Sequence, residues 1–331
     1  MTDETWTAKR ILEWIEGYLA QHGDENPRVS AQWLVSEALG VSRMQLFLDA
    51  ERPLTEDERA TLRDWTRRRG AGEPLQYITG ETAFRHITVK VRPGVLIPRP
   101  ETEVLVSEAL ALLPAAPKPQ DELDADLIRQ FVELGGEVDD EPVGAGYRPP
   151  NLDERPSLLV ADICTGSGCI ACSIAAEHPA THVIATDISP DAVALAQENV
   201  SSLELEERVE AIECDLAEGI DPSLTGAFDL VVSNPPYIPT AVLETLPSEV
   251  GEFEPGLALD GGADGLDVFR RLLDWCATAL KPDGAFAFEL HETCLDAAAA
   301  EAQAAGFTDV RIARDLAGRP RVLVGHLTPG R

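Results

Sequence analysis

The residues with the clearest chemical capacity are Asn234-Pro235-Pro236-Tyr237, which directly follow the apolar run 228–233. That run predicts a buried strand, and open α/β sheets bind ligands at the carboxyl ends of their strands. Because Pro235 and Pro236 have no N–H to donate, the motif offers a ligand backbone carbonyl oxygens and the Asn234 side chain. Such a site is suited to receive an NH2 group.

An NH2 group on an amide or an aromatic base is a poor nucleophile, because its lone pair is delocalised. The Asn234 side-chain oxygen and the Pro235 carbonyl could each accept one of its hydrogens, which favours a pyramidal nitrogen with a localised lone pair. Tyr237 would lie flat against the planar group around that nitrogen. Catalysis would then consist of positioning and electrostatics, and the proton would leave to water. We therefore predict transfer of an electrophilic methyl group to a conjugated nitrogen, rather than a merely structural Asn turn.

A second candidate site is the loop 162–168, which ends one predicted strand and opens a helix. Its glycines, Gly166 and Gly168, let the backbone approach a ligand without a Cβ in the way. Asp187 ends the next strand and could accept hydrogen bonds from ribose hydroxyls. Asp215 follows the third strand and could meet an adenine amino group, or equally cap a turn. The loop alone fits dinucleotide-binding enzymes and methyltransferases alike, so the Asn-Pro-Pro-Tyr motif is what favours S-adenosylmethionine as the cofactor.

The elements that must position these residues lie in 157–331, where apolar runs alternate with helical stretches. The expected strands are 158–163, 182–187, 208–213, 228–233, 284–290, 310–313 and 321–325. Helices are expected at 168–176, 190–200 and 265–280. This alternation predicts an α/β fold with a parallel, doubly wound sheet. The segment 314–320 is too short for a crossover helix, so the last two strands are expected to pair antiparallel or to lie apart.

Three further segments precede this domain. Residues 1–72 show helical periodicity, and Thr55–Glu58 forms a capping box at the start of one helix, so a small helical bundle is expected. Residues 73–114 are expected to form a β-hairpin, turning at Arg92-Pro93-Gly94, followed by a helix from about Pro100. Residues 115–156 contain eleven Asp or Glu against four Lys or Arg and are expected to be a mobile insertion with one short helix at most.

Composition excludes some classes of function. The 331 residues are 44% hydrophobic and 26% charged, which suits a globular protein with an ample core. The formal charge of −31 opposes binding of a polyanion, and the one basic cluster, Arg67–Arg69, suits a helix end. The sequence contains no long apolar run or signal peptide, which predicts a cytoplasmic protein without a membrane span. The six cysteines include a single C-x-x-C pair, so no metal site is expected.

Together, these motifs are similar to those of the HemK/PrmC family, the protein-(glutamine-N5) methyltransferases specific for peptide chain release factors. The resemblance covers most of the chain apart from about 115–156. It is carried by the segments 72–80, 96–103, 162–168, 234–238 and 315–321.

The resemblance implies a Rossmann-like S-adenosylmethionine methyltransferase sheet. It implies that the substrate is the Gln of the Gly-Gly-Gln loop in class I peptide chain release factors, and that the N-terminal helical module helps to recognise it. The implied catalytic residues are Asn234, Pro235, Pro236 and Tyr237. The cofactor site would contain Cys164, Thr165, Gly166, Ser167, Gly168, Asp187, Asp215, Leu216 and Asn234, and Arg99 and Thr102 would support the substrate side.

Some points stay open at this stage. Arg99 and Glu101 could equally form an ion pair at a helix start. Cys164 occupies a position where the family often has Gly, and a Cys is tolerable there if its φ is negative. His291 also stands where Gly is frequent, and a structural role is expected for it. Two alternative activities share the chemistry: methylation of adenine N6 in nucleic acid, which the net charge opposes, and methylation of a glutamine in a ribosomal protein.

Overall fold

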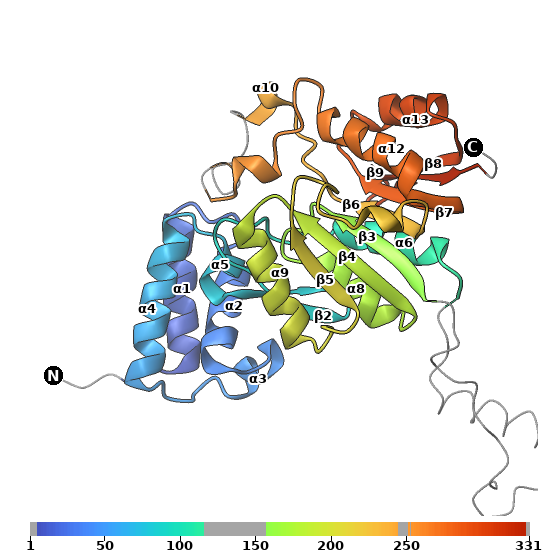
Figure 1. The fold of residues 1–331 in the computed structure, drawn as a ribbon. Coiled ribbons are helices and arrows are strands. Elements are labelled where there is room, and N and C mark those ends of the chain that lie inside the picture. Colours follow the sequence, from blue (N-terminus) through green and yellow to red (C-terminus); the bar gives the residue numbers. More distant parts are fainter. Residues whose placement is uncertain (1–4, 116–156, 244–250, 252, 329–331) are drawn as a thin grey trace, which may run out of the picture. The chain divides into compact units, whose positions relative to one another are not determined.

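The computed structural model describes residues 5–115, 157–243, 251 and 253–328 (Figure 1). The chain forms two compact units. Unit 1 comprises Met1–Arg99 and Pro236–Val268, and unit 2 comprises Pro100–Pro235 and Phe269–Arg331. The chain therefore passes between the units within the Pro-Arg-Pro segment that ends at Pro100, within the Asn-Pro-Pro-Tyr motif, and again after Val268. The predicted acidic insertion lies outside the described residues except for Ala115.

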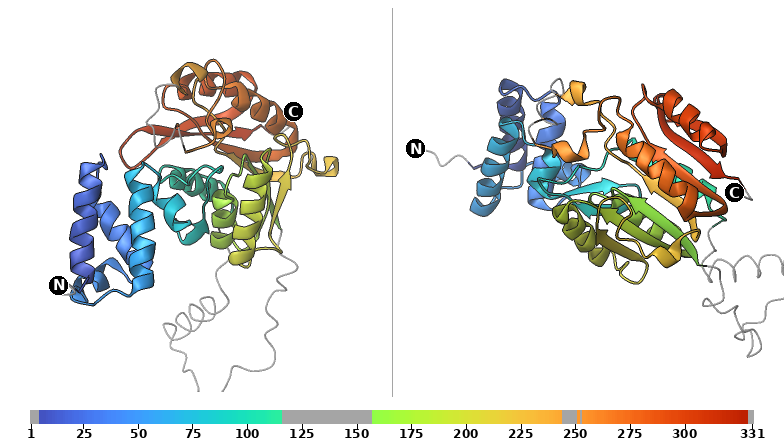
Figure 2. Two further views of the ribbon diagram at one scale, coloured as in Figure 1. Left: turned by 90° about the vertical axis from the view of Figure 1, so that its left-hand side faces the viewer. Right: turned by 45° about the horizontal axis from the view of Figure 1, so that its top comes forward.

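Unit 1 begins with a helical bundle (Figure 2). Its helices are α1 (Ala8–Gln21), α2 (Pro27–Leu39), α3 (Arg43–Leu48), α4 (Glu56–Gly70) and α5 (Leu75–Thr79). Ile15, Leu19, Leu34 and Leu62 are fully buried in its core, as the helical spacing of the apolar residues requires. The predicted capping box at the start of α4 is confirmed, since Thr55 and Glu58 exchange side-chain to backbone hydrogen bonds.

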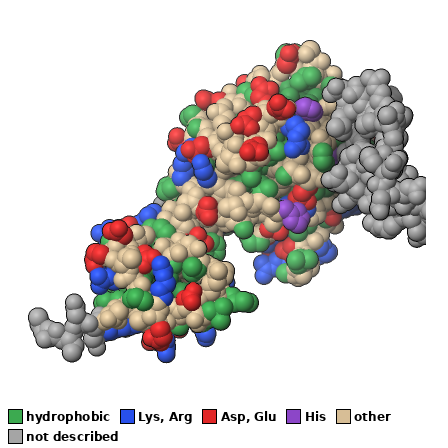
Figure 3. Space-filling view, turned by 90° about the horizontal axis from the view of Figure 1, so that it is seen from below, with side chains coloured by type: hydrophobic (Ala, Val, Ile, Leu, Met, Phe, Trp, Pro, Cys, Tyr) green, Lys and Arg blue, Asp and Glu red, His purple; other side chains and the backbone are tan. Residues whose placement is uncertain are grey.

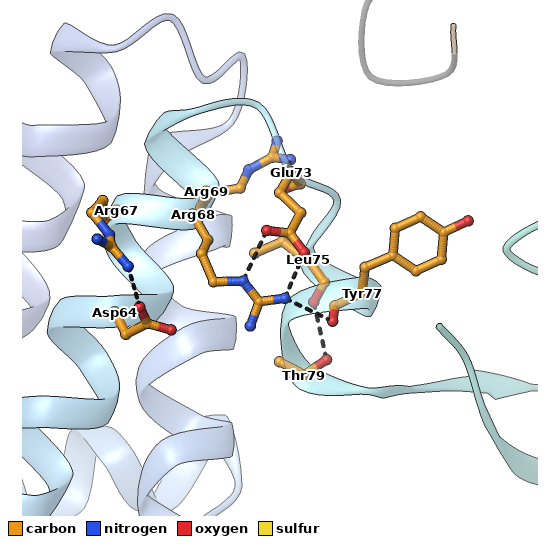
Figure 4. A network of polar contacts seen from close by, with 8 residues as sticks. All are labelled: Asp64, Arg67, Arg68, Arg69, Glu73, Leu75, Tyr77 and Thr79. Atoms are coloured by element: carbon orange, nitrogen blue, oxygen red, sulfur yellow. Dashed lines mark hydrogen bonds and ion pairs between the residues drawn. The ribbon is translucent and has the colours of Figure 1, made fainter. Parts of the chain in front are cut away.

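The three arginines in the last turn of α4 are all engaged in ion pairs, and Figure 4 shows those of Arg67 and Arg68. Arg67 pairs with Asp64 at 2.6 Å, and Arg68 contacts the Glu73 carboxylate through two nitrogens, at 2.8 and 2.5 Å. Arg69 donates to Asp24 at 2.6 Å. Because every one of these cations has a carboxylate partner, the cluster serves as a helix end within unit 1 and offers no unpaired basic patch.

The hairpin that follows consists of β1 (Glu81–Phe84) and β2 (Ile87–Lys90), paired antiparallel. The predicted turn position, at Arg92-Pro93-Gly94, is wrong. The strands are joined at Arg85-His86, and Arg85 takes a φ of 51° without being Gly or Asn, so no residue type marks this turn in the sequence. Arg92–Gly94 forms a separate turn after β2, closed by the Val95 N–H to the Arg92 carbonyl at 3.3 Å. Unit 1 also contains α10 (Thr240–Leu243) and the 3-10 turn η3 (Gly256–Ala258).

Unit 2 is built on a seven-stranded sheet in the order β5-β4-β3-β6-β7-β9-β8 (Figure 1). The strands are β3 (Leu158–Ile163), β4 (Thr181–Asp187), β5 (Val209–Glu213), β6 (Phe228–Ser233), β7 (Leu280–Glu289), β8 (Phe307–Arg314) and β9 (Pro320–Leu327). The first five run parallel, while β9 pairs antiparallel with both β7 and β8. This confirms the predicted fold class, including the antiparallel strand near the C-terminus.

Helices connect and cover these strands. They are α6 (Thr102–Leu112), α8 (Cys169–Glu177), α9 (Pro190–Ser202) and α13 (Leu295–Ala304), with the 3-10 turn η2 (Pro222–Leu224); α12 (Asp267–Ala279) begins in unit 1 and continues into unit 2. α6 packs on β6, β7 and β9. Val231, Val232, Phe286 and Phe288 are fully buried, so the central strands form the core that fixes the sheet's carboxyl edge. No helix in the described residues has the length and apolarity needed to cross a membrane.

Candidate active site

The predicted cofactor loop joins β3 to α8 at the carboxyl edge of the sheet. Its glycines take positive φ values, 56° at Gly166 and 77° at Gly168. A Cβ on Gly168 would lie 3.1 Å from the Cβ of Ala196 in α9, a tight contact that, with the positive φ, disfavours a side chain there. Asn199, also in α9, donates through Nδ2 to the Ser167 carbonyl at 2.8 Å. The Thr165 N–H donates to the Thr186 carbonyl at 2.9 Å, which fixes the loop to β4 as well.

Cys164, the first residue of this loop, has a φ of 63°. The condition of a negative φ is therefore not met: the turn out of β3 needs a left-handed residue, which costs a non-glycine roughly 1–2 kcal/mol. Burial, and then the neighbouring Asp187 and Asp162 carboxylates, raise the pKa of the Cys164 thiol. The thiol stays neutral at physiological pH, which makes it part of the loop wall and not a nucleophile.

Asp162 is the last but one residue of β3, and its side chain is fully buried. Its Oδ2 accepts from the Thr165 hydroxyl at 2.6 Å and from the Ala171 N–H at 3.1 Å. Its Oδ1 has no hydrogen-bond partner among the described residues. Burial raises the pKa of this carboxyl to about 7. A buried, unpartnered carboxylate oxygen beside a glycine loop fits a cationic ligand, and S-adenosylmethionine carries an ammonium group.

Asp162 lies within the candidate loop 162–168 but was not among the predicted cofactor residues, although an acidic residue inside the apolar strand Leu158–Ile163 was an available signal. The structure thus adds one residue to the predicted cofactor set, next to Cys164.

Asp187 ends β4 and faces the same loop. Its two carboxylate oxygens accept backbone hydrogen bonds, from Gly166 at 2.9 Å and from Ser189 at 2.9 Å. Each oxygen keeps a further lone pair for a ligand hydroxyl. Burial raises the pKa of Asp187. The next residue, Ile188, is half exposed, which leaves an apolar side chain beside Asp187 that the sequence analysis also missed.

Asp215 and Leu216 follow β5 at the same edge of the sheet. Leu216 has a φ of 49°, and its carbonyl accepts from the Thr186 hydroxyl of β4 at 2.6 Å. Asp215 forms an ion pair with Arg271 at 2.8 Å, so one of its carboxylate oxygens already has a cationic partner. The predicted cofactor residues after β3, β4 and β5 are therefore neighbours within unit 2.

Asn234 and Pro235 follow β6, the next strand of the sheet. Asn234 Nδ2 donates to the Thr102 hydroxyl at 3.3 Å, and Thr102 is a buried residue that begins α6. No donor reaches Asn234 Oδ1 within the part of the chain that the structure describes. The Ser233 hydroxyl donates to the Ile163 carbonyl at 2.5 Å, which ties the end of β6 to the start of the cofactor loop. Asn234 therefore presents a carbonyl oxygen at the edge of the sheet that carries the glycine loop.

Pro236 and Tyr237 continue the motif in unit 1. There the segment after η3 forms backbone hydrogen bonds with the motif's C-terminal neighbour, Ile238. The Ile238 N–H donates to the Leu259 carbonyl and the Gly261 N–H donates to the Ile238 carbonyl, both at 2.8 Å. A Cβ on Gly261 would come within 2.7 Å of the Tyr237 Cα, so this contact requires glycine. The backbone at Tyr237 is held rigidly by these neighbours.

Arg99 also belongs to unit 1, where its partner is Glu254 at 2.5 Å. Glu254 is buried, and its second oxygen accepts from the Ile97 N–H at 3.4 Å. The alternative interpretation of Arg99 and Glu101 as an ion pair is wrong, because Glu101 lies 3.8 Å from Arg321 instead. Glu254 could not be found from the sequence, since more than 150 residues separate it from its partner.

Other polar residues add no metal centre: the described residues contain no group of His, Cys, Asp and Glu arranged to hold one. His291 forms a local hydrogen bond with the Thr293 hydroxyl at 2.8 Å. Its structural role stays a prediction.

A mostly parallel sheet, a glycine loop after β3 and an Asn-Pro-Pro motif after β6 together define an S-adenosylmethionine-dependent methyltransferase. Residues 149–245 match the family model described as methyltransferase small domain, and residues 10–80 match the PrmC N-terminal domain. The release factor glutamine methyltransferase of Geobacter sulfurreducens is 38% identical over 324 residues, covering 98% of each chain. The enzyme of the same name from Rhodopirellula baltica is 36% identical, covering 97% of this chain and 96% of its own.

The chain therefore belongs to the release factor glutamine methyltransferase family, as the motifs predicted. Among solved structures, a protein-(glutamine-N5) methyltransferase (release factor-specific) from Alicyclobacillus acidocaldarius is 26% identical. The match covers 72% of this chain and 99% of that one, with a TM-score of 0.36.

Proposed function

We propose that this enzyme transfers a methyl group from S-adenosylmethionine to the N5 amide nitrogen of the Gln in the Gly-Gly-Gln loop of class I peptide chain release factors, and so modulates translation termination. The observation that carries the proposal is the orientation of Asn234. Its NH2 group donates one hydrogen bond, to the Thr102 hydroxyl, and this orientation directs Oδ1 away from Thr102 as an acceptor. An acceptor at this position suits an incoming amide N–H, whereas a donor would repel it.

On the cofactor side, S-adenosylmethionine supplies the electrophilic methyl group when it is bound. The loop residues Cys164, Thr165, Gly166, Ser167 and Gly168 would hold it through their backbone. Asp162 would face its ammonium group and Asp187 its ribose hydroxyls, while Ile188, Asp215 and Leu216 would border the adenine. These assignments agree with the neighbourhood of the residues in unit 2 and with the remaining acceptor capacity of the Asp162 and Asp187 carboxylates.

On the substrate side, Asn234 Oδ1 and the Pro235 carbonyl would accept the two amide hydrogens of the glutamine. This localises the nitrogen lone pair for attack on the methyl group. Pro236 and Tyr237 would contact the planar amide. Arg99, which is held by Glu254, would support the substrate side of the site. Thr102 would support it by orienting Asn234. The methylated amide nitrogen then loses its proton to water, so no side chain has to act as a strong base.

We assign the remaining segments by the same proposal. The helical module 1–72 would recognise the release factor, 73–114 would link it to the domain 157–331, and 115–156 would be an insertion. The enzyme would act in the cytoplasm, where its substrate is made.

The two alternative activities are not favoured, because the relatives carry the name release factor glutamine methyltransferase. The formal charge of −31 also opposes a nucleic-acid substrate. On the face drawn in Figure 3, Lys and Arg side chains are interspersed with Asp and Glu and do not gather in one patch.

The experiment is a methyl-transfer assay with radiolabelled S-adenosylmethionine. The acceptors are a purified release factor, the same protein with the loop glutamine replaced by alanine, ribosomal proteins and DNA. We expect label only on the unaltered release factor. Label on DNA alone, or on the alanine-substituted factor to the same extent, would overturn the proposal.

A further inference from the structure

The loop between β8 and β9, residues Asp315–Arg319, lies at the carboxyl edge of the parallel strands. β9 runs antiparallel to β7, with Glu289 opposite Val322, and the Leu290 N–H donates to the Arg321 carbonyl at 2.9 Å. The start of β9 is therefore level with the end of β7 (Figure 1). Nothing in the proposed catalytic chemistry uses this loop, although its sequence is one of the segments that carry the family resemblance.

The loop is pre-organised by the Asp315 side chain. Asp315 Oδ1 accepts from the N–H groups of Ala317 at 2.9 Å and of Arg319 at 2.8 Å. The backbone closes the turn as well, because the Asp315 N–H donates to the Arg319 carbonyl and the Gly318 N–H donates to the Asp315 carbonyl, both at 2.8 Å. The conformation is therefore fixed before any ligand arrives.

This rigid turn presents a large apolar side chain to solvent. Leu316 has a relative exposure of 105%, the highest among the exposed large hydrophobic residues of the described chain. Arg319, the last residue of the loop, is also exposed. Single exposed apolar residues are common, but a turn held by this many hydrogen bonds has lost the freedom to fold Leu316 back onto the protein. A partner with an apolar pocket would bury it at little entropic cost.

The same loop is connected to the residue that orients the candidate amide site. Arg321, a mostly buried side chain, donates through Nε to Asp315 Oδ2 at 3.2 Å and lies 3.8 Å from Glu101. Glu101 precedes Thr102, whose hydroxyl accepts from Asn234. A series of contacts within unit 2 thus connects the loop to Asn234, by way of Arg321, Glu101 and Thr102.

The usual size of a protein–protein interface implies that the bound substrate reaches the loop. β6 and β9 are separated only by β7, so their adjacent ends are about 10 Å apart at the usual strand spacing. A standard interface covers about 800 Å² on each partner, which is a disc of about 16 Å radius. A folded protein whose glutamine reaches Asn234 would therefore extend over the loop.

We propose that Leu316 is a docking residue for the folded protein substrate, inserted into an apolar pocket on the face that flanks the methyl-accepting glutamine. Asp315 and Arg321 hold the loop in the conformation that exposes Leu316. The proposal rests on the proposed function, because it takes the substrate to be a release factor. It assigns to unit 2 a recognition element that lies outside the N-terminal helical module.

The test compares two substrates for each variant: the intact release factor and a short peptide containing its Gly-Gly-Gln sequence, which ends before any flanking surface. For Leu316→Ser we expect kcat/KM on the intact factor to fall about 10- to 100-fold relative to kcat/KM on the peptide. Leu316→Met keeps the apolar bulk and should keep the wild-type ratio. Asp315→Ala keeps Leu316 but frees the turn, so it should lower the ratio in the same direction. Asp283→Asn alters an exposed residue near the start of β7, at the opposite edge of the sheet, and serves as the control.

An unchanged ratio for Leu316→Ser would overturn the docking role. An equal fall on both substrates would also overturn it, because it would place the residue in the transfer step. Failure of the proposed function itself is distinguishable, since the wild-type enzyme would then methylate neither the factor nor the peptide.

Discussion

Replacement of Thr102 by Val tests how the active-site amide is oriented. The Thr102 hydroxyl is buried and accepts from Asn234 Nδ2 at 3.3 Å, and Val has nearly the same shape but no acceptor. A neutral hydrogen bond contributes a net of about 0.5–1.5 kcal/mol. If that energy holds Asn234 Oδ1 toward the transition state, its loss lowers kcat by about 2- to 13-fold. The dissociation constant for S-adenosylmethionine should change by less than about twofold, because Thr102 is separate from the glycine loop.

Single-turnover methyl transfer with saturating release factor measures the first quantity, and isothermal titration of the cofactor measures the second. Thr102→Ser keeps the acceptor and should keep the rate within about twofold. The orientation argument would be refuted by a Val variant with a wild-type rate, or by a loss of cofactor affinity as large as the loss of rate.

Three further predictions concern the same edge of the sheet. Asn234→Ala should lower kcat about 100-fold or more while cofactor affinity is mostly retained; an equal loss of both in titration and turnover would make Asn234 a cofactor residue first. Gly168→Ala forces a Cβ to within 3.1 Å of Ala196 at a φ of 77°, so thermal denaturation should show a loss of about 1–2 kcal/mol, and an unchanged melting temperature would contradict this. Asp162 holds its proton to about pH 7 in the folded state but only to about pH 4 when unfolded, so the stability of the cofactor-free protein should fall as pH rises between those values. Asp162→Asn should remove that part of the slope in urea titrations, and parallel slopes for the two proteins would show the argument to be wrong.

The parallel core of unit 2 was predictable because each central strand is a continuous apolar run. β3 and β6 begin and end where the sequence placed them. β7 begins at Leu280 instead of Gly284, since Pro282-Asp283 resembled a turn before the strand and not a part of it. The antiparallel pairing of β9 followed from the short connection alone.

Conformations that depend on tertiary packing were not predictable. Arg85 and Cys164 take positive φ values although neither residue type favours them, so the residue types mark neither the hairpin turn nor the left-handed entry to the glycine loop.

In the candidate site, too, the features set by local sequence were predictable and those set by tertiary contacts were not. Local spacing identified the glycine loop, Asp187 and Asn234, because each lies at the carboxyl end of an apolar strand. The contacts that orient these residues join distant parts of the chain, such as Arg99 with Glu254 and Arg321 with Glu101. Thr102 entered only through the family resemblance, and its role became visible with its hydrogen bond to Asn234. A single sequence holds no signal for such pairs, since no periodicity links them.

The most direct test of the central claim is mass spectrometry of the release-factor peptide that contains the Gly-Gly-Gln loop, isolated from cells with and without this enzyme. The account predicts one added methyl group, located by fragmentation on the glutamine side chain, that disappears when the enzyme is absent or when Asn234 is replaced by Ala. A glutamine that stays unmethylated in the presence of the active enzyme, or one that is methylated equally without it, would contradict the account.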